Sequence, residues 1–171
     1  ATIIAGEGST RNVYTVRFIR EPATELTANV YENDVKEIIA SAEPQPDNGK
    51  DNIADNDLTT RWSAVAPCHV TYDLGEKTTI DYIGLAYYLG SERQTTVEIS
   101  VSDDSENWSR VFYGISSGLT ENLEYYDING ATGRYVRVKG LDSPSGWISI
   151  SEFKVYTEKE RLNKQERRSV I

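Results

Sequence analysis

The chain has 171 residues, of which 38% are hydrophobic and 26% charged, and its formal net charge at pH 7 is −9. This length suits one domain with additional segments, and no apolar run is long enough to cross a bilayer as a helix. The acidic balance argues against nucleic acid and against an anionic membrane surface as partners. Cys68 is the only cysteine, which excludes an internal disulfide. Because methionine is absent even at position 1, we expect a fragment of a longer chain or a processed one.

The first 34 residues read as segments outside the main domain. Residues 13–19 alternate as a β-strand does, and turn-forming residues 6–9 precede them. This pair resembles the closing hairpin of a cadherin-like repeat, so we interpret residues 1–21 as the terminal strands of a preceding repeat. Residues 22–34 are expected to be a linker. Residues 35–40 fit either a short strand or a helical turn.

From residue 35 to residue 156 the chain consists of short β-forming runs separated by turns. Many short strands spaced by turn signals predict an all-β sandwich or jelly roll. The charged residues 157–171 are expected to form a separate C-terminal tail, either one short helix or a solvated end. The expected strands and turns are strands 80–88, 97–102, 110–113, 135–138 and 148–155, and turns 73–75, 129–130 and 142–146.

No catalytic constellation is apparent. The single histidine, His69, follows Cys68 directly, and adjacent side chains on a strand point to opposite faces, so the two cannot form a dyad. One histidine also excludes a local pair of histidine metal ligands. Carboxylates are numerous, but nothing in their spacing singles out a glycosidase pair. The sequence therefore predicts a binding function, with Trp108 expected in the core.

The loop 55–63 carries candidate metal ligands. Asp55, Asp57 and Thr60 place hard oxygen atoms within one tight turn, which suits Ca²⁺. The spacing is not that of an EF-hand, because Thr60 occupies the position of the invariant glycine and Ala66 that of the bidentate glutamate. An ordinary acidic turn remains the alternative at this point.

The segment 147–156 shows a change of phase. Ile148 and Ile150 share one face, but the next apolar pair is Phe153 and Val155. Such a slip predicts a β-bulge, which can turn Glu152 away from its expected face.

A family resemblance is carried by the segments 55–63, 72–75, 83–88, 101–104, 134–138 and 149–152, together with Gly90, Arg93 and Trp108. Residues 35–156 resemble coagulation-factor type C (discoidin) domains, and specifically the family 32 carbohydrate-binding modules. Residues 111–118 and 123–126 further resemble modules attached to alginate lyases, although Ile148 stands where that group has an asparagine.

The resemblance implies a discoidin-like jelly-roll β-sandwich with one structural Ca²⁺. Asn56 replaces the glycine that the family has after its first aspartate, and asparagine tolerates a left-handed backbone. His69 replaces a common tryptophan. One of the two aspartates is expected to offer only its carbonyl. The expected ligands are Asp55, Asp57, Thr60 and Glu152, with backbone carbonyls near Asn52.

The function implied is non-catalytic binding of a polysaccharide, on which the module would retain a covalently linked catalytic domain of a secreted or cell-surface bacterial enzyme. We expect an acidic glycan such as alginate. If Trp62 lies inward, Arg61 faces outward and can bind a carboxylate, and Trp147 can stack on a sugar ring. Arg93 and Tyr88 are further candidates, followed by His69.

Three alternatives remain open. The ligand could be a neutral, galactose-type glycan. The domain could instead serve adhesion or membrane binding, but its candidate loops 89–94 and 142–146 are mainly polar, which favours a sugar. A purely structural spacer is the third alternative.

Overall fold

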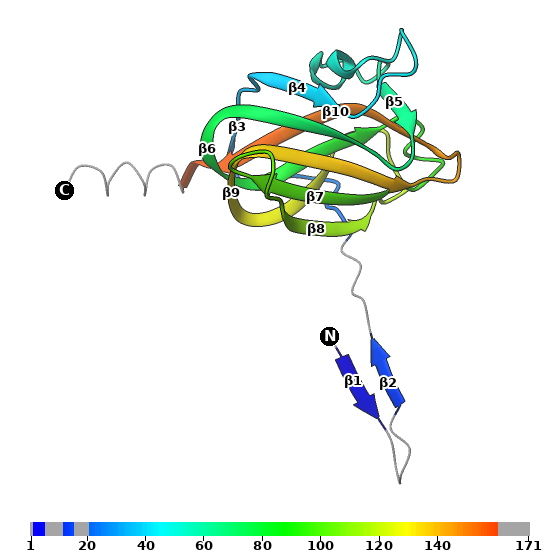
Figure 1. Ribbon diagram of the computed structural model, residues 1–171, viewed down its shortest axis with the longest axis vertical. Coiled ribbons are helices and arrows are strands. Elements are labelled where there is room, and N and C mark those ends of the chain that lie inside the picture. Colours follow the sequence, from blue (N-terminus) through cyan, green and yellow to red (C-terminus); the bar gives the residue numbers. More distant parts are fainter. Residues whose placement is uncertain (1, 6–11, 16–20, 161–171) are drawn as a thin grey trace, which may run out of the picture.

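A computed structural model describes residues 2–5, 12–15 and 21–160 of the chain. Strand β1 (Thr2–Ala5) pairs antiparallel with β2 (Asn12–Thr15), as Figure 1 shows. The expected turn at 6–9 and residues 161–171 of the expected tail lie outside the described residues. The boundary predicted at 156/157 is wrong, because Thr157 and Glu158 belong to the last strand and pair with Tyr31 and Val30. The relation of β1 and β2 to a cadherin-like repeat stays a prediction.

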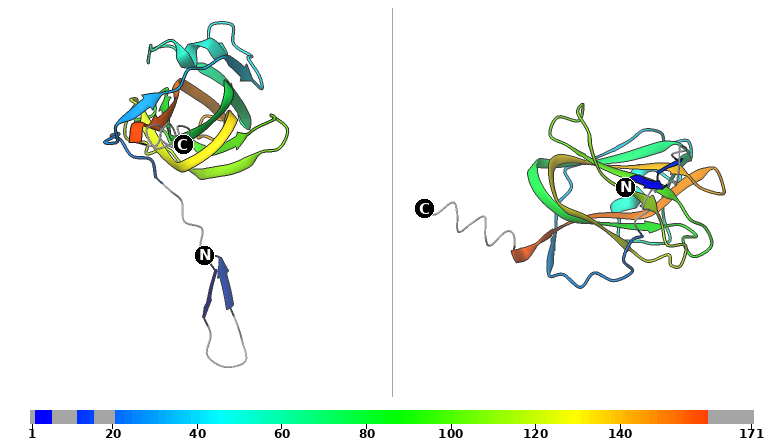
Figure 2. Two further views of the ribbon diagram at one scale, coloured as in Figure 1. Left: turned by 90° about the vertical axis from the view of Figure 1, so that its left-hand side faces the viewer. Right: turned by 90° about the horizontal axis from the view of Figure 1, so that it is seen from below.

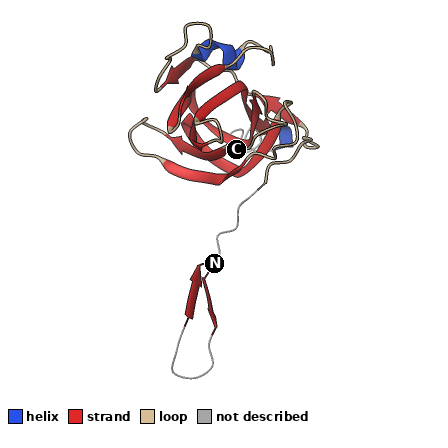
Figure 3. Ribbon diagram, turned by 90° about the vertical axis from the view of Figure 1, so that its right-hand side faces the viewer, coloured by secondary structure: helices blue, strands red, loops and turns tan. Residues whose placement is uncertain are grey.

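The prediction of an all-β sandwich is confirmed, since strands make up nearly all regular structure in the described residues (Figure 3). No helix among these residues has the length and apolar character that crossing a membrane requires. The elements that follow the hairpin are β3 (Val30–Glu32), β4 (Glu37–Ala40), the 3₁₀ helix η1 (Lys50–Ala54), β5 (Trp62–Val65), β6 (Cys68–Tyr87), β7 (Thr96–Ser102), β8 (Ser109–Ile115), β9 (Glu124–Asp142) and β10 (Trp147–Glu158).

The long strands β6 and β9 bend so that each contributes to two layers (Figure 2). In the first layer, residues 68–73 of β6 lie between β4 and residues 135–140 of β9, and β7 and β8 continue the sheet. In the second layer, residues 82–87 of β6 pair with β10 and with the start of β9, and β10 also pairs with β3 and β5. The sequence predicted separate shorter strands here. Positive φ angles at Gly75, Asn129 and Gly130 let the chain bend without ending the ladder.

Alternation along the strands fills the space between the layers. Val70 and Tyr72 of β6 point inward from the first layer, and Phe153 of β10 points inward from the second. The rings of Tyr72 and Phe153 stack with centroids 3.9 Å apart. Trp62 is fully buried, as predicted, and its indole N–H donates to the carbonyl of Ala42. Outward side chains of the two layers therefore lie on opposite sides of the sandwich.

Residues 22–34 do more than link two segments. Strand β3 pairs with the end of β10, and Ala23 forms a bridge with Tyr125 of β9. The side chain of Asn33 donates to the carbonyl of Val155. Contacts of the sandwich therefore begin before Val35. The segment 35–40, left open between strand and helix, forms strand β4.

Candidate functional site

The loop after η1 gathers oxygen atoms around one point. The hydroxyl of Thr60 lies 2.7 Å from Oδ2 of Asp55, 3.0 Å from the carbonyl oxygen of Asp57 and 3.4 Å from that of Asn52. Asn56 turns the chain there with φ of 61°, so the left-handed backbone expected of it is observed. One carboxylate, one hydroxyl and two carbonyls thus converge within a short segment.

The two aspartates of this loop differ in role. The carboxylate of Asp57 accepts hydrogen bonds from the amide and the hydroxyl of Thr59, which lower the pKa of Asp57. Its carbonyl oxygen, in contrast, faces Thr60. Asp55 therefore offers its side chain to the cluster, and Asp57 offers its backbone.

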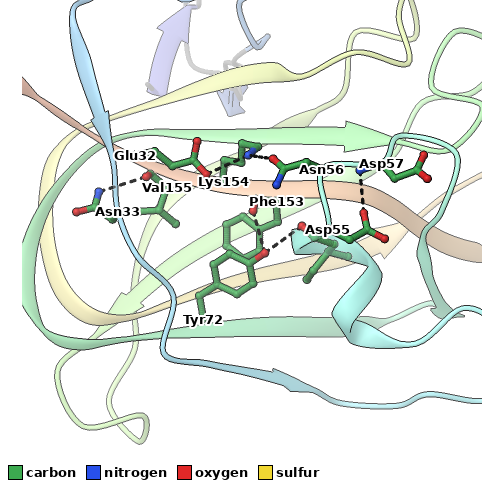
Figure 4. A network of polar contacts seen from close by, with 10 residues as sticks. Glu32, Asn33, Asp55, Asn56, Asp57, Tyr72, Phe153, Lys154 and Val155 are labelled. Atoms are coloured by element: carbon green, nitrogen blue, oxygen red, sulfur yellow. Dashed lines mark hydrogen bonds and ion pairs between the residues drawn. The ribbon is translucent and has the colours of Figure 1, made fainter.

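Glu152 reaches this loop from β10. The register of β10 against β6 shifts between Ile150 and Glu152, which is the predicted bulge. The side chain of Glu152 is buried, and neither of its carboxylate oxygens has a hydrogen-bond partner within the described residues. Burial raises the pKa of Glu152, and the charge of Lys154 and the nearby backbone amides of Asn56 and Asp57 oppose this only in part. Neither amide has the geometry of a hydrogen bond to the carboxylate. Figure 4 shows Asp55, Asn56 and Asp57 beside the stretch of β10 that follows Glu152.

These residues fit a bound cation. A buried carboxylate without a partner is costly, and a metal ion removes that cost. The donors are all oxygens, as Ca²⁺ prefers. No group of three or more His, Cys, Asp or Glu side chains with metal-binding geometry occurs within 21–160, the part described with side chains. A cation here would therefore depend on Thr60 and on backbone carbonyls besides Asp55 and Glu152.

A residue that sequence reasoning missed holds this loop in place. The hydroxyl of Tyr72 lies 3.1 Å from the carbonyl oxygen of Ile53 in η1 and 2.8 Å from that of Phe153 in β10. It connects the loop to the bulged strand beside Glu152 (Figure 4). The Tyr-Asp-Leu-Gly motif at 72–75 contained this residue, but only the fold shows that it reaches both elements.

Three of the predicted ligand residues lie together. The guanidinium carbon of Arg61 lies 3.8 Å from the centroid of the Tyr88 ring, and that of Arg93 lies 5.8 Å from the same centroid. Arg93 also donates to the carbonyl of Tyr88. None of the salt bridges of the described residues involves either arginine. We call Arg61, Tyr88 and Arg93 the arginine cluster.

Trp147 belongs to the same outward face, but further along it. Trp147 lies opposite Val65 in the β5–β10 ladder, and Ser149 lies opposite Ser63. The two serines are buried and their hydroxyls are 2.8 Å apart, so this face of both strands points to the same side. Arg61 directly precedes β5. Because side chains alternate along a strand, Arg61 lies on the same face as Ser63 and Val65. The serine pair therefore separates Trp147 from the arginine cluster.

His69 is not part of this arrangement. It lies opposite Lys139 in the first layer, where its side chain points outward. Burial lowers the pKa of His69, as do the charges of Arg137 and Lys139. The structure thus brings His69 together with other basic residues, on the opposite side of the sandwich from Trp147.

The family model described as F5/8 type C domain matches residues 37–153. The chain belongs to the F5/8 type C domain family. Comparison with curated proteins gave no match.

Among solved structures, this F5/8 type C domain is similar to the family 32 carbohydrate-binding module (CBM32) of AlyQ in complex with 4,5-unsaturated mannuronic acid. The identity is 34% and the TM-score 0.70, and the match covers 73% of this chain and 97% of that chain. It is also similar to truncated AlyQ with CBM32 and alginate lyase domains, at 33% identity and TM-score 0.72, over 77% of this chain and 34% of that one. The chain therefore spans about a third of that two-domain protein.

A third solved structure is a pectin-binding carbohydrate-binding module. It is 24% identical with a TM-score of 0.68, and the match covers 72% of this chain and 91% of that chain. At this identity the likeness shows the fold alone. The AlyQ module, in contrast, supports the resemblance to CBM32 modules, which are non-catalytic.

Proposed function

We propose that this domain binds an acidic saccharide at the arginine cluster, with a uronic acid as the preferred unit. The observation that carries this proposal is the position of the Arg61 guanidinium over the Tyr88 ring, with no salt bridge to any described residue. A stacked guanidinium is held in one orientation, and its free N–H donors match the two oxygens of a carboxylate. The solved AlyQ module, which holds 4,5-unsaturated mannuronic acid, supports this choice of ligand.

The rest of the outward face extends the proposed site. Trp147 is half-buried beside the exposed Val65. An indole face suits stacking on a sugar ring. Since the serine pair lies between Trp147 and the arginine cluster, Trp147 would contact a neighbouring unit of the glycan. The site would therefore favour a chain of units over a single sugar.

The proposed Ca²⁺ has a structural role. Asp55, Thr60 and Glu152 would supply side-chain oxygens, with the carbonyls of Asn52 and Asp57. The ion would link the loop before β5 to the bulge of β10. Because Arg61 follows Thr60 directly, fixing the loop also fixes the start of the proposed ligand site. The buried carboxylate of Glu152, which has no hydrogen-bond partner in the described part of the chain, supports this proposal.

We also propose that the domain acts outside the cell as part of a longer polysaccharide-degrading protein. This rests on the likeness to AlyQ, in which a CBM32 domain and an alginate lyase domain share one chain. The domain would keep such an enzyme on its substrate and would itself turn over no polysaccharide.

A titration panel tests the ligand. The Ca²⁺-loaded chain is titrated with 4,5-unsaturated mannuronate, galacturonate oligosaccharides and galactose at one fixed salt concentration. We expect weak binding of uronates that decreases with added salt, because exposed charged contacts supply it. Binding of galactose without binding of any uronate would assign the neutral-glycan alternative. Binding only to phospholipid vesicles would assign the membrane alternative.

A further inference from the structure

A second cluster of arginine, lysine and tryptophan lies on the outward face of the first layer. The guanidinium carbon of Arg137 is 3.7 Å from the centroid of the Trp108 ring. Trp108, expected in the core, is instead half-buried over this face, and its indole N–H donates to the carbonyl of Ser105. His69 and Lys139 lie opposite each other in the β6–β9 ladder. They lie beside Arg137, because theirs are the next outward positions after Thr71 and Arg137.

Within residues 21–160, Arg137, Lys139 and His69 form no salt bridge with an acidic side chain. Five arginine–aromatic contacts occur in the described residues, and two of those arginines, Arg110 and Arg134, also form salt bridges. Arg137 forms no salt bridge with any residue that the structure describes, and its Nε donates to the hydroxyl of Thr71. The Nη donors therefore remain available for an incoming anion.

Three carboxylates close to this face, those of Glu98, Asp103 and Asp104, have other partners. Glu98, which lies opposite Lys139 in the β7–β9 ladder, pairs with Arg110. In the turn before Trp108, Asp103 pairs with Lys77, and Asp104 accepts from the backbone of Glu106 and Asn107. In a chain with an excess of acidic residues, Arg137 and Lys139 thus form a local positive surface.

We propose that this face is a second binding site, for the anionic groups of a polysaccharide. Arg137 would bind a carboxylate or sulfate through its Nη donors, and Lys139 would contact the next anionic group along the strand direction. A protein surface built from strand residues at alternate positions suits an extended polymer, because outward side chains repeat about every 7 Å. This site is separate from the arginine cluster and does not rest on the function proposed for it.

Two sites on opposite layers have a consequence for polymers. A long anionic chain, or two neighbouring chains, can engage both sites, which increases the apparent affinity without new contacts. A short saccharide engages one site only. The double variant Arg137→Ala/Lys139→Ala should therefore weaken binding of polymer while binding of a short uronate at the arginine cluster is retained.

Affinity gel electrophoresis of the Ca²⁺-loaded chain tests this inference. The gels contain alginate, polygalacturonate, dextran sulfate or neutral dextran, and the matched control is Lys36→Ala/Lys159→Ala, which removes the same charge elsewhere. We expect Arg137→Ala/Lys139→Ala to weaken retardation by at least one anionic polymer about tenfold or more, and the control to leave it unchanged. The carboxylate and sulfate gels show which anion is preferred.

Calorimetric titration of a short uronate, run beside the gels, distinguishes this site from the arginine cluster. If Arg61→Ala loses the short uronate but keeps retardation that depends on Arg137 and Lys139, the second site stands alone. Equal retardation of both double variants, or binding of polyglutamate without binding of any polysaccharide, overturns the inference. A thermal melt of Arg137→Ala/Lys139→Ala close to that of the parent chain confirms that the variant is folded.

Discussion

The guanidinium of Arg61 lies 3.8 Å from the centroid of the Tyr88 ring, and no acidic side chain of the described residues forms a salt bridge with it. This contact joins the segment before β5 to the end of β6, which are far apart in sequence. Since a cation over an aromatic face is attracted to it, Tyr88 orients Arg61 without neutralising it. The arginine is thereby kept available for an anionic ligand.

Replacing Tyr88 tests this orienting role. Tyr88→Ala should weaken uronate binding about tenfold, because Arg61 and Arg93 lose the ring between them. Tyr88→Phe keeps the ring and should retain most of the binding. Isothermal titration with a uronate oligosaccharide measures both. An equal loss in the two variants would mean that the hydroxyl, and not the ring, carries the effect.

Removal of Ca²⁺ should destabilise the domain. A ligand that binds only the folded state stabilises it by about 2.7 kcal/mol at a hundredfold excess over Kd. Adding a chelator should therefore lower the Tm, and adding Ca²⁺ back should restore it, while Mg²⁺ at the same concentration should restore less. A Tm that does not respond to chelation contradicts the proposed metal site.

Glu152 should make the stability of the metal-free protein depend on pH. Its pKa is raised in the folded state, so the fold favours the protonated carboxyl, and stability decreases as the pH rises above the unfolded value of about 4.3. In the presence of chelator, Glu152→Gln should therefore have a higher Tm than the parent at about pH 7, and the difference should shrink toward about pH 4.3.

With Ca²⁺ bound, the parent should instead have a higher Tm than Glu152→Gln, because the ion favours the ionised carboxylate that glutamine lacks. The exposed Glu106 supplies the control, since Glu106→Gln should follow the parent in both conditions. The same order of Tm values with and without Ca²⁺ would show that Glu152 is not a ligand.

The close approach of Gly140 and Ile148 gives a test of the fold. A Cβ at Gly140 would lie 2.7 Å from Cδ1 of Ile148 and closer still to Cγ1 and Cγ2. Gly140→Ala should therefore destabilise the domain by about 1–3 kcal/mol. In the background of Ile148→Ala, which removes these atoms, the same change should cost much less. Urea unfolding of the four proteins measures the coupling, and additive costs would argue against the close contact between Gly140 and Ile148.

The sequence predicted those features that depend on local alternation. The slip from Ile150 to Phe153 located the bulge at Glu152, because apolar periodicity reports directly which way each side chain points. The prediction that Trp62 points inward likewise placed Arg61 on the outward face. The family resemblance added the type of sandwich, which alternation alone left open between a sandwich and a jelly roll.

Features that depend on which layer a residue joins could not be predicted locally. β6 is long enough to enter both layers, so an outward residue near its start, His69, and one just past its end, Tyr88, lie far apart. Trp108 was expected in the core because tryptophan is apolar. Its partner Arg137 comes from β9, and only the pairing of β7 with both β8 and β9 brings the two together.

The most direct test of the account is calorimetric titration of 4,5-unsaturated mannuronate oligosaccharides into the parent chain, Arg61→Ala and Arg110→Ala. Arg110 is an exposed arginine paired with Glu98 in the first layer, so its loss should leave binding of a short saccharide unchanged. We predict binding by the parent and by Arg110→Ala, with affinity reduced about tenfold or more in Arg61→Ala at an unchanged Tm. Equal affinity in all three proteins would contradict the proposed binding site.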